Sequence, residues 1–169
     1  LGYGLARVRQ GVQLRALIQV AEDGARRLRA TLDSLLDPFV LLESVRDETG
    51  RLVDLRYVDA NGSAVAYNRR PREQLIGSTM LELFPALFSN GPLSSYFEAI
   101  ETGEPMILDD VPYGNEMFGQ TRYYDLRGVR NGDGLALTWR DVTDRRLAAQ
   151  ELADSRADFQ LLAENASDF

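Results

Sequence analysis

The sharpest boundary in the sequence is Trp139-Arg140-Asp141-Val142-Thr143-Asp144-Arg145-Arg146, where a β-prone segment changes into a helical one. Strand-forming residues run from 134 to 142 and stop there. Thr143 is a favourable helix N-cap, and an acid at Asp144 interacts favourably with the dipole of a helix that begins at this point. The sequence therefore predicts a last strand that passes directly into a C-terminal helix.

Four more β-prone segments precede this boundary. Residues 39–45 and 52–58 are separated by a turn that contains Gly50, which predicts an antiparallel hairpin. Residues 105–111 and 120–129 predict the third and fourth strands. The segment Asn131-Gly132-Asp133-Gly134 then favours a tight hairpin to the last strand, because asparagine and glycine accept positive φ angles.

The chain between the second and third strands predicts short helices. Their expected ranges are 63–68, 72–76, 79–84 and 93–102. Helices of one or two turns are not stable alone, so they need a sheet to pack against. The order of elements therefore predicts an α+β domain with a five-stranded antiparallel sheet and short helices on one face.

The N-terminal segment, residues 1–36, predicts a helix with a heptad pattern. Glycines at positions 2, 4 and 11 interrupt the pattern, so we expect the regular helix to begin near Leu14 and to end before Asp37-Pro38. Apolar residues then recur at alternating intervals of four and three, which is typical of a coiled-coil seam. The expected dimer interface consists of Leu14, Ile18, Ala21, Ala25, Leu28, Leu32 and Leu35. The alternative is one amphipathic helix that covers its own domain.

These patterns divide the chain into three parts: the N-terminal helix (1–36), a central domain (37–143) and a C-terminal linker helix (144–169). The linker helix has a second heptad-like spacing that includes Leu152 and Phe159, so both flanking helices are expected to be coiled-coil-like. The chain lacks an initial methionine, and we expect it to be a segment of a longer protein.

Three local sequences follow one another in the order found in a known family. They are Asp59-Ala60-Asn61 with Ala64 and Tyr67, then Leu75-Ile76-Gly77 with Leu81-Glu82-Leu83-Phe84-Pro85, and finally residues 139–146. In order and spacing they resemble the PAS family over about residues 32–146. The residues after 160 resemble the start of another such domain.

The resemblance implies a PAS fold and a sensory, signal-transmission module of a bacterial signalling protein. It also implies that Asp141 and Thr143 couple the last strand to the C-terminal helix through polar contacts. Arg145, or another nearby arginine, is the expected partner of Asp141. Any output activity, such as a kinase or diguanylate cyclase, is expected outside this segment, which is not itself expected to be an enzyme.

The chain has no cysteine and no histidine. This excludes Cys/His zinc sites, a Ser-His-Asp relay, His-ligated haem and a cysteinyl-flavin photosensor within the segment. Asp109 and Asp110 are adjacent acids in a predicted strand, where neighbours point to opposite faces and do not form an acid/base pair. We therefore expect no metal, no His-ligated haem, no cysteinyl flavin and no catalytic residues; flavin bound without a thiol stays open, although no motif demands it.

Large apolar residues lie on the segments that would enclose a PAS cavity. A small apolar ligand such as a fatty acid is one expectation, with residues 114–119 as a mobile lid; a packed, ligand-free dimerisation spacer is the alternative. The expected ligand-binding residues are Met80, Phe84, Phe88, Phe97, Met106, Met117, Phe118, Tyr124 and Trp139, with Leu87 and Leu126 beside them.

Charge and hydropathy limit the partners and the location that we expect for this chain. The net charge of -7 argues against nucleic acid, because phosphate binding needs a basic surface. No apolar run reaches the roughly 18 residues of a membrane span. We expect a homodimer through the flanking helices, neighbouring signalling domains as further partners, and a cytoplasmic location, with a membrane tether elsewhere in the full protein as a variant.

Overall fold

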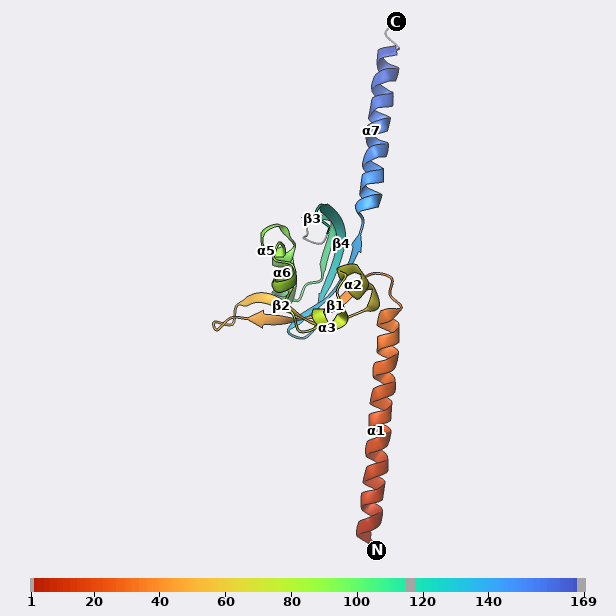
Figure 1. Cartoon of the computed structure of the whole chain (residues 1–169), viewed down its shortest axis with the longest axis vertical. Helices are drawn as coiled ribbons and strands as arrows, with labels where there is room; N and C mark the ends of the chain where they lie inside the picture. Colours follow the sequence, from red (N-terminus) through yellow and green to blue (C-terminus); the bar gives the residue numbers. More distant parts are fainter. Residues whose placement is uncertain (1, 115–117, 167–169) are drawn as a thin grey trace.

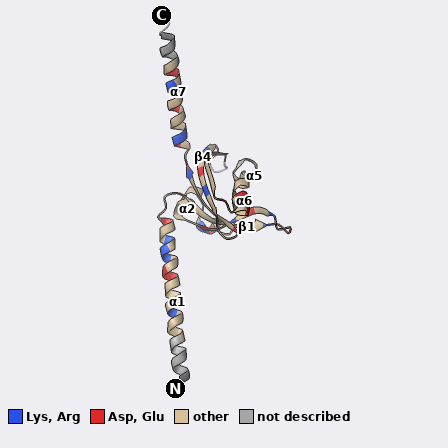
Figure 2. Ribbon diagram, turned by 180° about the vertical axis from the view of Figure 1, so that it is seen from behind, with Lys and Arg blue, Asp and Glu red and all other residues tan. Residues whose placement is uncertain are grey.

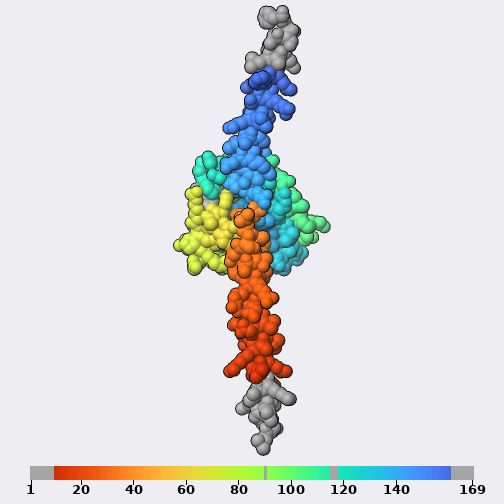
Figure 3. All heavy atoms as spheres, turned by 90° about the vertical axis from the view of Figure 1, so that its right-hand side faces the viewer, coloured from red at the N-terminus to blue at the C-terminus, as the bar shows by residue number. Residues whose placement is uncertain are grey.

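The computed structural model describes residues 2–114 and 118–166. A sheet-containing domain lies in the middle, and two long helices, α1 (Gly2–Asp33) and α7 (Thr143–Ala166), extend from it in opposite directions (Figure 1). The two helices lie along nearly one line on the same side of the domain (Figure 3). None of the helices in the described part is long and apolar enough to cross a membrane.

The domain is built on a five-stranded antiparallel sheet, as expected. Its strands in chain order are β1 (Phe39–Arg46), β2 (Leu52–Ala60), β3 (Met106–Gly114), β4 (Thr121–Arg130) and β5 (Gly134–Asp141). Their spatial order is β2-β1-β5-β4-β3, so the last strand lies at the centre, between the first and the fourth. The residue that begins α7 therefore follows the central strand of the sheet directly.

Gly134 is required where β5 starts. It pairs with Glu43 of β1, and a Cβ atom there would lie 2.0 Å from the carbonyl oxygen of Leu42. Only glycine permits this approach of two backbones. The Asn131–Gly134 segment predicted as a hairpin turn does join β4 to β5, and the Asn131 N–H donates to the Gly134 carbonyl at its closure.

Short helices cover one face of the sheet. They are α2 (Gly62–Asn68), α3 (Arg72–Leu75), α4 (Met80–Leu83), α5 (Leu87–Asn90) and α6 (Leu93–Thr102). Four match the predicted ranges closely; α5 was not expected, because one turn between two prolines carries no periodic pattern. Thr79 caps α4 in a reciprocal capping box with Glu82.

The core lies between these helices and the inner sheet face. Alternate strand residues such as Val40 and Leu42 of β1, or Leu135 and Leu137 of β5, point into it. Leu75 and Ile100 close it from the helical side and are almost fully buried. The core is therefore one continuous cluster that holds the single-turn helices in place.

The expected limits of α1 were wrong at both ends. The helix passes through Gly4 and Gly11 without a break, because helix formation is cooperative and tolerates isolated glycines. It ends at Asp33, so Leu35 lies beyond the helix. The side-chain amide of Asn61 binds the Leu32 carbonyl, and Asp33 accepts the Gly62 N–H, which fixes the end of the helix against the domain.

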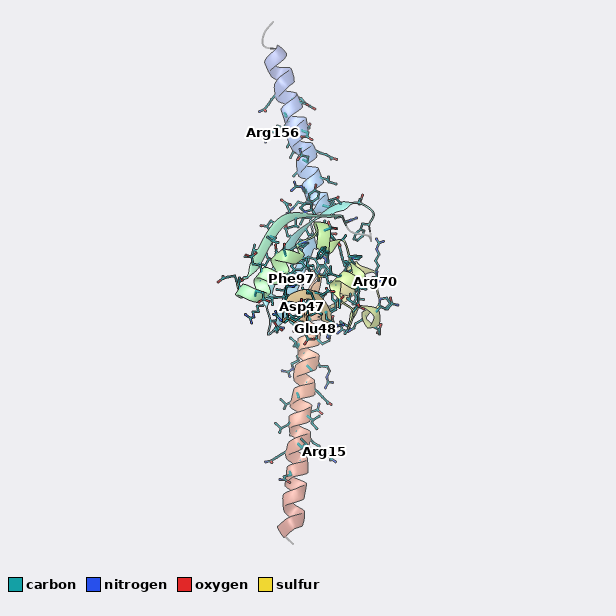
Figure 4. All side chains as sticks on the ribbon, turned by 90° about the vertical axis from the view of Figure 1, so that its left-hand side faces the viewer. Arg15, Asp47, Glu48, Arg70, Phe97 and Arg156 are labelled. Carbon is teal, nitrogen blue, oxygen red and sulfur yellow. The ribbon has the colours of Figure 1, made fainter. Side chains whose placement is uncertain are left out.

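The seam of α1 does not cover its own domain. Leu14 is 60% exposed and Leu28 is 62% exposed, and the helix extends away from the sheet (Figure 1). Figure 4 shows the side chains of Arg15 and Arg156 projecting from α1 and α7 into solvent. Pairing of the seam with a second chain stays a prediction.

Candidate functional site

A cavity of about 80 Å³ lies between the inner sheet face and the short helices. Every strand except β1 contributes to its walls, together with α2, α4, α5 and α6. It is lined by Tyr57, Tyr67, Asn68, Met80, Phe84, Leu87, Pro92, Tyr96, Val111, Tyr113, Tyr124, Leu126, Leu137 and Trp139. Within the described part of the chain, the lining contains no acidic or basic residue, and half of its residues are aromatic.

The predicted ligand-binding residues divide between the cavity and the rest of the fold. Met80, Phe84, Tyr124 and Trp139 line the cavity, as do Leu87 and Leu126. Whether they bind a ligand stays a prediction.

The other predicted residues lie elsewhere. Phe88 is 78% exposed, because its single-turn helix turns Leu87 inward and Phe88 outward. Met106 is buried beside Gly128, and Phe97 of α6 (labelled in Figure 4) packs at the edge of the core. Met117, in the expected lid, lies outside the described residues. Phe118 contacts the ring of Tyr67.

Most of the tyrosines that line the cavity were not predicted from the sequence. Five of the chain's seven tyrosines line the cavity, and only Tyr124 was among the predicted residues. Tyr57 and Tyr113 lie at inward positions of β2 and β3, so strand alternation was the signal that could have identified them.

Tyr67 connects the cavity to the start of α7. Its hydroxyl lies 2.9 Å from the Tyr124 hydroxyl and 3.1 Å from Oδ2 of Asp141. Because a carboxylate only accepts, Tyr67 gives its single hydrogen to Asp141 and accepts from Tyr124. Burial is the main cause that raises the pKa of Tyr67 well above its usual range, followed by the hydrogen bond with Tyr124.

Asp141 is the hub of this C-terminal joint. Its Oδ1 accepts the backbone N–H of Thr143 at 3.0 Å, and its Oδ2 accepts from Arg122 at 2.6 Å as well as from Tyr67. Burial alone would raise the pKa of Asp141, but hydrogen bonds from Thr143 and Arg122 outweigh it and hold the pKa below its ordinary value. The arginine partner of Asp141 is thus Arg122.

Two expectations at this joint need correction. Thr143 does not cap α7 with its side chain, because its Oγ1 accepts the N–H of Tyr123 on β4 at 2.9 Å. Asp141, two residues earlier, binds the N–H of Thr143 instead. Arg145 points away from Asp141 and pairs with Asp125 at 3.2 Å and with Asp110 at 3.7 Å.

Of the two adjacent acids of β3, Asp110 belongs to the same joint, which it reaches through a bulge. Asp110 has a φ of 54°, and the register between β3 and β4 shifts between Leu108 and Val111. The Asp110 carboxylate pairs with Arg146 at 3.4 Å, while Asp109 pairs with Arg127. Both acids thus serve in ion pairs, and α7 is fastened by its first turn.

A second joint fastens α1. Asn61 is fully buried and binds four backbone groups: its Oδ1 accepts from Phe39 and Ala64, and its Nδ2 donates to Leu32 and Asp37. Arg29 of α1 reaches Asp59, which also pairs with Arg72. Burial opposes ionisation of Asp59, yet the two arginines lower its pKa.

Charges elsewhere are spread over the surface. Acidic and basic side chains alternate along α1 and α7 (Figure 2). Among the described residues, no three carboxylates converge as they would to hold a metal ion.

Comparison with known proteins agrees with this fold. A family model described as the PAS fold matches residues 53–147. A search of curated proteins finds no match. Structures of PAS domains do match, at sequence identities at which the likeness concerns the fold alone.

Three such structures are representative. The PAS domain of an HTR-like protein from Haloarcula marismortui is 14% identical, with a TM-score of 0.53 over 75% of this chain and 98% of that one. A PAS domain from Colwellia psychrerythraea is 17% identical, with a TM-score of 0.51 over 71% and 98%. An RNA-binding Light-Oxygen-Voltage receptor is 17% identical, with a TM-score of 0.55 over 79% of this chain and 37% of the receptor.

The matched segment spans more than half of the chain and contains most of the sheet, the cavity and the joint at Asp141. The chain therefore belongs to the PAS family, whose domains are sensory modules of signalling proteins.

Proposed function

We propose that this domain senses a small molecule in its cavity and transmits the binding event to α7 through Tyr67 and Asp141. The observation that carries the proposal is the position of the Tyr67 hydroxyl. It belongs to a cavity-lining residue and also contacts the carboxylate that binds the first N–H of α7. The alternative function, a ligand-free spacer, has no use for such a connection.

The size of the cavity bears on the ligand. At roughly 10–15 Å³ for each water-sized group, about 80 Å³ holds roughly five to eight non-hydrogen atoms. This is far less than the chain of a fatty acid. A compact ligand therefore fits the proposal better than the fatty acid suggested by the sequence.

The transmission step is a rearrangement of hydrogen bonds. A ligand against Tyr67 or Tyr124 competes for the hydrogen bond between their hydroxyls, which lie only 2.9 Å apart. Displacement of Tyr67 removes one of the two side chains that hold Oδ2 of Asp141, leaving Arg122. Because Oδ1 of the same carboxylate binds the Thr143 N–H, rotation of the carboxylate alters the direction in which α7 begins.

We further propose that the domain acts as a homodimer through the seam of α1, and that α1 and α7 link it to neighbouring signalling domains. The seam exposes Leu14, Ile18 and Leu28 at heptad spacing, which favours a second copy of the same helix as partner. The acidic net charge of -7 supports protein rather than nucleic-acid partners. The cytoplasmic location and an output domain elsewhere in the protein belong to the same proposal.

Hydrogen exchange tests the transmission. Val111→Phe places a ring in the cavity and mimics occupancy, and Val111→Leu fills less if the larger side chain prevents folding. We expect either change to alter amide exchange in the first two turns of α7. In a Tyr67→Phe background that response should disappear, since the contact to Asp141 is gone.

The matched control is Tyr123→Phe. Tyr123 lies on β4 near the same joint, under Arg146, but does not line the cavity. Tyr123→Phe should leave the change in amide exchange of α7 intact when the cavity is filled. Unchanged exchange in α7 when the cavity is filled, or a response that survives Tyr67→Phe, would contradict the proposed route.

The dimer has its own test. Leu28→Glu places a charge in the seam and should convert a dimer into a monomer in light scattering. Val20→Glu is the control, because Val20 is equally apolar and 71% exposed on α1 but lies off the heptad seam. A monomer in the unsubstituted protein, or equal effects of both substitutions, contradicts the seam as the interface.

A further inference from the structure

Two tyrosine hydroxyls in the cavity have no hydrogen-bond partner among the residues that the structure describes. They belong to Tyr57 of β2 and Tyr96 of α6, each only 4% exposed. Buried polar groups are almost always hydrogen-bonded, because an unpaired one loses the bonds it makes to water. Because Tyr57 and Tyr96 line the cavity from the sheet side and the helix side, an occupant of the cavity can pair with both hydroxyls.

Both hydroxyls are kept in the protonated form. Burial is the main cause that raises the pKa of Tyr96, and the phenol groups of Tyr57, Tyr113 and Tyr124 raise it further. Burial likewise raises the pKa of Tyr57, with a smaller contribution from Tyr113. These side chains therefore stay neutral at physiological pH and present hydroxyls that both donate and accept.

The remaining walls define what else the occupant needs. Five of the other twelve lining residues are aromatic, Phe84 and Trp139 among them, and aromatic rings pack favourably against such walls. None of the lining residues that the structure describes carries a charge, so an ion would be desolvated without a counter-charge from them. The volume of about 80 Å³ leaves room for one ring and not for two.

We infer that the cavity binds a neutral, single-ring aromatic compound whose hydroxyl or carbonyl group pairs with Tyr57 and Tyr96. The inference rests on the proposed function only in taking the cavity as the sensing site. The two hydroxyls provide specificity for a polar substituent, and the aromatic walls provide affinity for the ring.

The test compares phenol with toluene, which has the same shape and size but no hydroxyl. Their dissociation constants are measured by NMR titration of the isotope-labelled chain. Tyr57→Phe and Tyr96→Phe remove one hydroxyl each; they break no hydrogen bond of the described structure, so both variants should fold. We expect each to reduce the preference for phenol over toluene about tenfold. Tyr123→Phe, outside the cavity, should leave the preference unchanged.

Several outcomes overturn the inference. If phenol shifts no resonance of the cavity residues, it does not bind there, and the hydroxyls of Tyr57 and Tyr96 pair only with water. A preference for phenol that is equal in all variants removes Tyr57 and Tyr96 from recognition. Benzoate that binds as tightly as phenol shows that neutrality is not selected.

Failure of the inference is distinguishable from failure of the proposed function. If phenol does not bind but Val111→Phe still alters exchange in α7, the ligand class is wrong and the transmission route stands. If phenol binds through the two tyrosines but neither phenol nor Val111→Phe alters α7, the ligand class stands and the route is wrong.

Discussion

The two helices that leave the domain are fastened in different ways. At the α1 joint, a neutral and fully buried side chain, Asn61, binds four backbone groups. At the α7 joint, the central group is a partly exposed carboxylate, Asp141, held by other side chains. Asn61 does not line the cavity, whereas Asp141 contacts Tyr67, which does.

The difference separates a fixed attachment from an adjustable one. Bonds between a buried amide and the backbone have no alternative partners, so any movement there leaves polar groups unpaired. A carboxylate shared among Arg122, Tyr67 and Thr143 exchanges one partner for another at lower cost. We therefore expect α1 to stay fixed to the domain while α7 responds to the cavity.

The largest effect is expected at the fixed joint. Asn61→Ala leaves four backbone groups without their side-chain partner, and we expect it to lower the free energy of unfolding by about 3 kcal/mol or more. Asn68→Ala is the control, because Asn68 is also buried but donates to a single carbonyl, that of Ala64. Its loss should cost about 1 kcal/mol. Urea denaturation measures both; equal costs would show that Asn61 is not a special anchor.

An intermediate effect, dependent on pH, is expected at the adjustable joint. Because the pKa of Asp141 in the folded protein lies below its ordinary value of 3.8, folding favours the ionised form. Its contribution to stability is present at pH 7 and is lost as the pH falls through the folded pKa. We expect Asp141→Asn to lower the free energy of unfolding by about 2 kcal/mol at pH 7 and by progressively less as the pH falls below 3.8.

Urea denaturation between pH 7 and pH 3 checks this result. Asp144→Asn is the control, since Asp144 is an exposed carboxylate in the first turn of α7. Its substitution should cost little at any pH in that range. A cost of Asp141→Asn that does not change with pH would show that the carboxylate charge is not what holds the joint.

The smallest effect is expected at Arg29. Its ion pair with Asp59 fastens α1, but the Arg29 side chain is 38% exposed and Arg72 pairs with the same carboxylate. Arg29→Gln should therefore lower the free energy of unfolding by about 0.5 kcal/mol, and Arg72→Gln should lower it by about as much. If the double variant lowers the free energy of unfolding by far more than the two single variants together, each arginine replaces the other as the partner of Asp59. Thermal denaturation of the single and double variants measures this coupling.

The sequence predicted most of the fold because the patterns were local. Alternating apolar residues defined the strands, and the Asn131–Gly134 turn closed the last hairpin. The central position of β5 was not predicted, because it depends on the pairing of β5 with β1, which is far away in the chain. The continuous course of α1 through Gly11 was missed, because a glycine weighs against a helix locally but not in a long cooperative one.

The site was less predictable because its contacts join residues far apart in the chain. Tyr67 and Asp141 are 74 residues apart, and no spacing rule connects them. Arg122 was missed as the partner of Asp141 for the same reason, since the nearer Arg145 is drawn to Asp125 and Asp110. Phe88 was assigned to the cavity by residue type alone, and a single helical turn does not reveal which side faces inward.

A distance measurement tests most directly the central claim that cavity occupancy redirects α7 through Tyr67. The chain has no cysteine, so Glu98→Cys on α6 and Ala153→Cys on α7 provide two defined spin-label sites on exposed positions. Dilution with unlabelled protein isolates the distance within one chain. We predict that Val111→Phe shifts the distance distribution and that adding Tyr67→Phe abolishes the shift. Identical distributions with the cavity empty and filled would contradict the claim.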